Sequence, residues 1–277
     1  MALSFGGSGF SAQKSINYMS QNKSLMDSSL EKIASGKRIL NGADDSGGLS
    51  VAMKLQNQIN TTNSQQSTVE NAKSYVEAQS TALQSAAGIV AEIQTLKNTY
   101  DTTKSADAAD PLLGTYESQF QDLRAQLSSL EGETLNGTKL FDRGSDMTVS
   151  NVRLTDLGFH AALEDGGQDL GNLVDTNVTL DNVTTTNLTN IYDKVSGLVT
   201  EAAGDASTLG FASDYLSNMS INLESAHGRI MDVDLAEESA NLAKYSMQYE
   251  AAATAVAQAN VAMGAVLDLL LGSINKD

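Results

Sequence analysis

The sequence predicts a mainly α-helical protein: an antiparallel coiled coil or helical bundle in which segments from the two ends of the chain pair, with a small β-containing region near the middle. Three observations predict this class. Apolar residues recur at intervals of three and four over long stretches, and proline occurs once in 277 residues. Aromatic residues make up 5% of a chain that lacks tryptophan and cysteine. Such a composition favours long helices over a β-sandwich.

The strongest periodic signal runs from Val69 to Tyr100. Apolar residues seven positions apart form one series there, and a second series occupies the complementary positions. This pattern is typical of a coiled-coil stripe sustained over four heptads. We therefore expect one long helix that needs partners along its whole length. The stripe consists of Val69, Val76, Leu83, Val90 and of Ala72, Ala86, Ile93, Tyr100.

Four further segments show helical spacing. The first runs from Ile16 to Ile33 and should end at Ser35-Gly36, because glycine commonly terminates helices. After a glycine-rich connector over residues 37–48, the later segments are 113–130, which should return antiparallel to the long helix, and 188–233. Beyond Asp234 the chain is alanine-rich and free of proline, and its apolar surface needs a partner.

Short β-prone pieces interrupt the helical pattern between residues 144 and 189. They run from Met147 to Leu154 and from Val174 to Val183, separated by several glycines. We expect a small region of strands and loops there.

The formal net charge of −17 limits the classes of partner. The negative charge lies over residues 101–277, whereas the first hundred residues are near neutral. A surface of this kind repels polyanions, so we expect no nucleic-acid partner. No stretch approaches 18 apolar residues, and the N-terminus lacks a basic segment followed by an apolar core, so we expect neither membrane insertion nor a cleaved signal.

The sequence carries no recognisable catalytic or metal-binding motif, and we expect no enzyme, no cofactor and no metal site. Its two histidines, His160 and His227, are far apart and form no HExxH pattern. Asp232 and Asp234 have the spacing of a carboxylate clamp, and Asp44-Asp45 is an acidic pair beside glycines. Acidic residues near a helix start also favour the helix dipole, and this structural interpretation is preferred.

A cluster of threonines offers a candidate site for modification. The alternative is a solvated strand without modification. The hydroxyl groups that could carry O-linked sugars belong to Thr176, Thr179, Thr184, Thr185, Thr186 and Thr189.

Two long segments resemble the terminal regions of bacterial flagellin. They are QNKSLMDSSLEKIASGKRILNGADDSGGLSVA (Gln21 to Ala52) and NLESAHGRIMDVDLAEESANLAKYSMQYEAAATAVAQANVAMGAVLDLLL (Asn222 to Leu271). The stretch LNGTKLF (Leu135 to Phe141) is similar to the flagellin sequence that ends the second long helix. The matching segments occur at both ends and in the same order.

The resemblance implies a division of the chain into paired arms. An inner domain would combine residues 1–45 with 234–277, and a rod domain would combine 46–143 with 190–233. Residues 144–189 would form a small variable outer region. The resemblance also implies that apolar residues of the arms carry assembly, and those expected to do so are Leu30, Ile33, Ile39, Val256, Val266, Leu267 and Leu270.

The function implied by the resemblance is that of a structural subunit that polymerises with itself into the extracellular filament of the bacterial flagellum. Expected partners are the flagellar type III export apparatus and a chaperone, the filament cap, the hook-associated proteins and other flagellins. An alternative within the same resemblance is the hook–filament junction protein, which shares both terminal patterns but forms a short ring. A helical adhesin or secreted effector would instead be a stable monomer with ordered ends.

Overall fold

The structure is a computed structural model that describes residues 5–141, 146–149, 152–154, 157–163, 173–175 and 177–274. The chain forms two compact units, one from Met1–Ile59 with Asn222–Asp277 and one from Asn60–Ile221. The helices are α1 (Phe5–Ser35), α2 (Ser46–Ala106), α3 (Leu112–Glu131), α4 (Phe159–Ala162), α5 (Thr185–Met231) and α6 (Leu235–Ile274). The short strands are β1 (Thr134–Leu135), β2 (Thr138–Lys139), β3 (Met147–Val149) and β4 (Val152–Leu154).

The core of the second unit is built on the predicted stripe of α2. Val69, Val76, Leu83 and Val90 are all 0% exposed, and the complementary residues from Ala72 to Tyr100 are buried as well. The prediction of a long helix buried along one face is confirmed. Burial of this kind stabilises the fold by about 1.5–3 kcal/mol for each large aliphatic side chain.

Helix α5 supplies a second seven-residue series to the same core. Its buried side chains include Leu188, Val195, Ala202, Leu209 and Leu216. The two helices run antiparallel, because Ser220 near the end of α5 donates a hydrogen bond to Asn63 early in α2. At the other end Lys104 of α2 pairs with Asp181, just before α5 begins. Matching heptad series on two helices are typical of coiled-coil packing.

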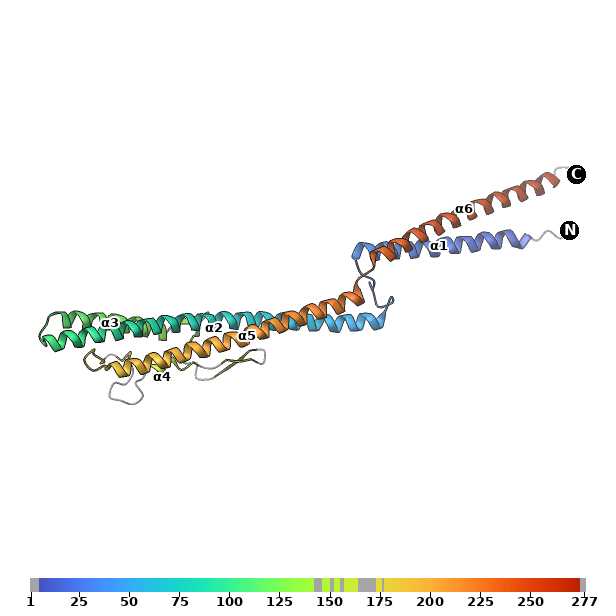
Figure 1. Cartoon of the computed structure of the whole chain (residues 1–277). Helices are drawn as coiled ribbons and strands as arrows, with labels where there is room; N and C mark the ends of the chain where they lie inside the picture. The colour runs from blue at the N-terminus through green and yellow to red at the C-terminus, as the bar shows by residue number, and fades with distance from the viewer. Residues whose placement is uncertain are drawn as a thin grey trace. The chain divides into compact units, whose positions relative to one another are not determined.

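Helix α3 folds back along α2 after a short turn (Figure 1). The turn is closed by hydrogen bonds in which Asp107 and Asp110 accept from the backbone N–H groups of Ala109 and Leu112, both at less than 3.0 Å. Phe120 and Leu127 then reach the shared core at 0% exposure. The predicted antiparallel partner helix is confirmed.

Two small hairpins follow α3. β1 pairs with β2 and β3 pairs with β4, both antiparallel. Asn136 and Gly137 have φ of 52° and 79°, the conformation that a two-residue hairpin turn requires. The strand expected within Met147 to Leu154 is confirmed as the β3–β4 hairpin.

The prediction of a second strand from Val174 to Val183 is wrong. Its described residues form turns, with Val178 N–H donating to Asp175 O and Asn182 N–H to Thr179 O. Val178 and Leu180 are buried, but no strand pairs with them within the described parts of the chain. The solvated strand considered for the threonines is also wrong for Thr185, Thr186 and Thr189, which lie in the first turns of α5.

Phe120→Ala tests how much the core of the second unit contributes to stability. We expect the free energy of unfolding of the monomer to fall by about 3–5 kcal/mol, because the substitution leaves a cavity among buried side chains. Urea unfolding followed by circular dichroism measures the loss. Phe211→Ala is the matched control, since Phe211 is 74% exposed and its truncation should change stability by less than about 0.5 kcal/mol. Equal losses in the two variants would contradict this placement of the core.

Candidate assembly surfaces

Two connectors lie in the first unit, one between α1 and α2 and the other between α5 and α6, and backbone hydrogen bonds join them. Arg38 N–H donates to Met231 O at 2.6 Å, and Val233 N–H donates to Gly36 O at 3.1 Å. The Arg38 guanidinium also donates to Ile230 O at 2.8 Å. Gly36 has a φ of 69°, which only glycine adopts readily, and it ends α1 as the sequence predicts. The bonds join residues 36–38 to 230–233.

A small apolar cluster lies beneath this backbone junction. Ile39 is 2% exposed and packs with Ala52 and Met231. Gly48 is part of the same arrangement, because a Cβ there would lie 2.9 Å from Ile39 Cδ1 and would collide with Asp45. Ile39, one of the residues expected to carry assembly, is therefore used inside the fold of its own chain.

The acidic pairs noted in the sequence cap backbone groups. Asp45 accepts from Gly48 N–H at 2.7 Å at the start of α2, and Asp234 accepts from Ala236 N–H at 2.9 Å at the start of α6. Asp44 accepts from the N–H groups of Leu40 and Asn41. The described residues contain no group of three metal-ligating side chains, and the capping role satisfies helix-start donors that otherwise lack partners.

The helices α1 and α6 pack along each other (Figure 1), but they enclose almost no core. Among the side chains described in these two helices, at 13–35 and 235–265, Ser29 alone is buried. Large apolar side chains remain exposed instead. They are Ile16, Tyr18, Leu25 and Leu30 on α1, and Leu235, Met247, Val261 and Met263 on α6.

The other residues expected to carry assembly lie on this helix pair. Leu30 is 56% exposed, whereas Ile33 and Val256 are half-buried. Val266, Leu267 and Leu270 belong to α6 by their backbones, but their side chains lie outside the described residues.

Most of the threonine cluster is accessible. The side chains of Thr179, Thr184, Thr185, Thr186 and Thr189 are exposed, whereas Thr176 lies outside the described residues. Thr184 immediately precedes α5, and its hydroxyl accepts from Asn187 N–H at 3.2 Å. Thr189 donates to Thr185 O at 2.9 Å.

The histidines show no catalytic arrangement within the described parts of the chain. His160 Nδ1 lies 2.5 Å from Glu131 Oε1 at the surface, joining α4 to the end of α3. His227 is half-buried on α5. No helix among the described residues is sufficiently long and apolar to cross a membrane.

Sequence reasoning missed a set of polar contacts that hold the segment from Val174 to Leu180 against α3. On α3, Glu117 accepts from Leu180 N–H at 2.9 Å, and Gln121 donates to Val178 O at 3.1 Å. Arg124 is 6% exposed and donates to the carbonyls of Val178 and Val174. Burial lowers the pKa of the Arg124 guanidinium, against the opposite influence of Glu117 and Asp175. The sequence did contain a signal for these contacts. Glu117, Gln121 and Arg124 are spaced by four and three residues, which places their side chains on one face of a helix.

Helix α2 holds the first hairpin in a similar way. Tyr75 and Gln79 donate from their side chains to the carbonyls of Lys139 and Leu140. Gln79 is buried, and a buried amide without a partner would be costly. These two contacts join the hairpin to the heptad stripe of α2.

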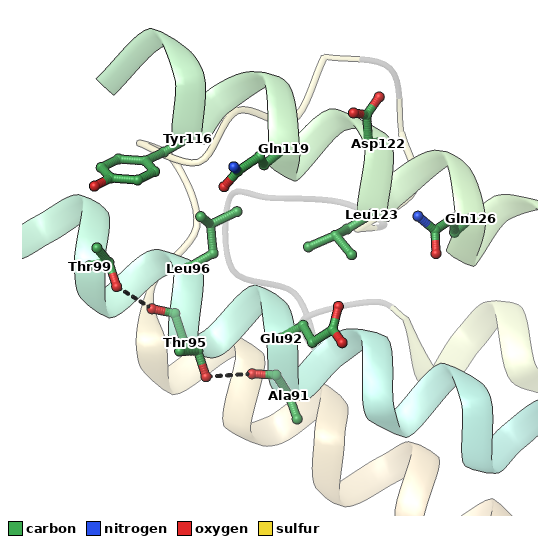
Figure 2. A pocket seen from close by; sticks show the side chains of 10 residues that line it. All are labelled: Ala91, Glu92, Thr95, Leu96, Thr99, Tyr116, Gln119, Asp122, Leu123 and Gln126. Atoms are coloured by element: carbon green, nitrogen blue, oxygen red, sulfur yellow. Dashed lines mark hydrogen bonds between the residues drawn. The ribbon is translucent and has the colours of Figure 1, made fainter. Parts of the chain in front are cut away.

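A groove lies between α2 and α3 and has a volume of about 680 Å³. Figure 2 shows Leu96 of α2 and Leu123 of α3 pointing into the space between the helices, with Tyr116 at one end. Glu92 and Asp122 are also among the lining residues, but the Asp122 carboxylate points away from the space between the helices. We call this feature the α2–α3 groove.

Asp44 gives the first connector a dependence on pH. Its backbone hydrogen bonds lower its pKa below the ordinary value of 3.8. A carboxylate with a lowered pKa stabilises the fold above its ordinary pKa, and this contribution disappears as the pH falls through the lowered value. We expect Asp44→Ala to unfold at a lower temperature than the wild type at pH 7, with a smaller difference well below pH 3.8, where the neutral carboxyl is a weaker acceptor.

Asp44→Asn is the matched control for this titration, because it keeps an acceptor oxygen but cannot ionise. Its difference from Asp44→Ala should not change with pH. Thermal unfolding followed by circular dichroism at both pH values measures all three proteins. A difference between wild type and Asp44→Ala that persists unchanged in acid would contradict the role assigned to the carboxylate.

Comparison with known proteins agrees with this architecture. Residues 9–146 match the bacterial flagellin N-terminal helical region, and residues 193–270 match the bacterial flagellin C-terminal helical region. The chain is 25% identical to a flagellin of Bacillus subtilis (strain 168), covering 94% of this chain and 97% of the relative. It is 27% identical to a flagellin of Halalkalibacterium halodurans, covering 87% and 90%.

A third relative is the flagellar filament 30.7 kDa core protein of Treponema maltophilum, 21% identical over 90% of this chain and 93% of the relative. The two matched regions contain all of α2 and α3 and most of α1, α5 and α6. The chain therefore belongs to the bacterial flagellin family and is a structural subunit of the flagellar filament type.

Proposed function

We propose that this chain polymerises into the flagellar filament by burying the exposed faces of α1 and α6 against other copies of itself. The observation that carries the proposal is the helix pair of the first unit. These two helices span 31 and 40 residues, and Ser29 is the only buried residue among their described side chains.

A balance of free energies supports this mechanism. Ordering a backbone costs about 1–2 kcal/mol per residue, and a helix pair obtains most of its stability from packing of its apolar faces. On α1 and α6 the large side chains that would supply this burial, such as Leu30 and Val261, remain in water. Contact with neighbouring subunits removes them from water. The arms become fully stable only in the polymer.

The proposed division of labour follows the family. Residues 1–45 and 234–277 form the inner arms, 46–143 and 190–233 form the rod, and 144–189 form the exposed outer region. The assembly residues are those of the arms, with Ile39 acting through the junction of the connectors.

The chain is exported unfolded through the flagellar type III apparatus with a chaperone, and it assembles outside the cell beneath the cap and beyond the hook-associated proteins. Absence of cysteine supports this route, because no disulfide obstructs threading.

Leu30→Asp tests the role of the arms. We expect purified protein to lose salt-induced polymerisation, because a carboxylate on a face buried between subunits must be desolvated. Sedimentation and electron microscopy measure the polymer. Ser24→Asp is the matched control, since it adds the same charge at an exposed position of α1 whose neighbours one turn away are all polar, and it should polymerise.

Electron microscopy of the wild type separates the remaining alternatives. Long filaments support the proposal. Short rings would indicate the hook–filament junction protein, and a protein that remains monomeric with ordered ends would indicate an adhesin or effector. Normal filaments from Leu30→Asp would contradict the proposed role of the α1 face.

We also propose O-linked modification of the threonine cluster, supported by the exposure of its described hydroxyl groups. Intact-mass and peptide mass spectrometry of the protein from its native source should show sugar masses on peptides that contain Thr179 to Thr189. Recombinant protein from a host without the modifying enzymes should have the unmodified mass. An unmodified peptide from native filaments would contradict this proposal.

A further inference from the structure

Helix α5 exposes two adjacent aromatic side chains on the face opposite its core. Phe211 is 74% exposed and Tyr215 is 67% exposed. They are four residues apart, so they lie next to each other on the helix surface. Leu209 and Leu216 fix the orientation of this face, because both are buried in the core of the second unit. We call Phe211 and Tyr215 the aromatic pair.

The fold of the chain does not explain this exposure. Isolated exposed apolar residues are common on protein surfaces, whereas adjacent large aromatic side chains mark contact surfaces. Aromatic residues are also the side chains that most often dominate the binding energy of an interface. The aromatic pair is therefore a candidate contact surface for a partner outside its own chain.

The second unit also offers a receptor of the right chemistry. The α2–α3 groove has a volume of about 680 Å³, within the range of sites that enclose molecules larger than one side chain. Leu96 and Leu123 provide an apolar floor, and Tyr116 provides an aromatic wall (Figure 2). Glu92 places a carboxylate acceptor beside it (Figure 2).

We propose that the aromatic pair of one subunit docks into the α2–α3 groove of a second copy of this chain. The inference rests on the proposed function, because a homopolymer presents another copy to every surface. The two surfaces come from different elements, so their contact is head-to-tail. A head-to-tail contact generates a ring where the rotation between subunits closes and an open helical polymer where it does not, and the proposed filament is the open form.

The chemistry of the two surfaces is complementary. The Phe211 ring would lie against Leu96 and Leu123, where it leaves water. The Tyr215 hydroxyl can donate to a carboxylate at the groove, and a hydrogen bond to a charged acceptor is stronger than one between neutral groups.

The acidic groove and the net charge of −17 oppose approach of a second copy, so salt should strengthen the contact by screening this repulsion.

Two variants of the full-length chain test the two sides of the contact. Phe211→Ser with Tyr215→Ser removes the aromatic pair, and Thr95→Trp fills the groove from α2, where Thr95 is exposed. Each should raise the critical concentration for polymerisation at least about tenfold, the size of effect that removal of an aromatic anchor produces. Tyr192→Ser and Thr81→Trp are matched controls on the same two helices, and they should polymerise as the wild type does.

Combining the two changes identifies whether they affect one contact. If the aromatic pair and the groove meet, the critical concentration of the combined variant should not exceed the higher of the two single-variant values. One contact can be lost only once. Effects that multiply would overturn the pairing, as would wild-type polymerisation by both single variants. Circular dichroism of the monomers should be unchanged, since all the substituted side chains are exposed.

Failure of this contact is distinguishable from failure of the proposed function. Wild-type protein that polymerises while the variants do so equally well overturns the docking and leaves the filament assignment intact. Wild-type protein that forms no polymer under any salt condition overturns the proposed function, and the docking fails with it.

Discussion

Burial of one face of α2 is the constraint on which the rest of the second unit depends. The stripe from Val69 to Tyr100 forms one wall of the core, and α3, α5 and both hairpins pack against it or attach to residues beside it. A helix of this length gains its stability from packing rather than from its intrinsic propensity. The heptad series of α5 completes the arrangement, because a repeat of seven on both helices keeps their seams in contact.

The heptad pattern was readable from the sequence because it consists of many similar signals in succession. The ends of α1 and α3, the return of α3 and the capping role of Asp234 were predictable for the same reason, since each follows from local chemistry. The Asn136-Gly137 turn was not identified as a hairpin, although its sequence is a strong local signal. The flanking strands are only two residues long each, too short for an alternating pattern to stand out.

The error at Val174 to Val183 has a physical cause. Val178 and Leu180 alternate and are buried, as the residues of a half-buried strand would be. The Val178 carbonyl and the Leu180 N–H, however, bond to side chains of α3 instead of to another strand. A pattern along one segment does not reveal which distant side chains will supply its hydrogen bonds. The aromatic pair was equally invisible, because an exposed phenylalanine in a helical segment looks like a core residue until the helix is oriented.

The junction of the connectors has a consequence for the order in which the chain can fold. Arg38 and Ile230 are 192 residues apart, so α1 leaves the ribosome long before its partner α6 exists. At about 5–20 residues per second, synthesis separates the two helices by roughly ten seconds or more. The first unit cannot form during that interval, since half of its backbone is missing. The topology thus keeps the leading arm unpaired until synthesis of the chain is nearly finished, without any inhibitor of folding being encoded.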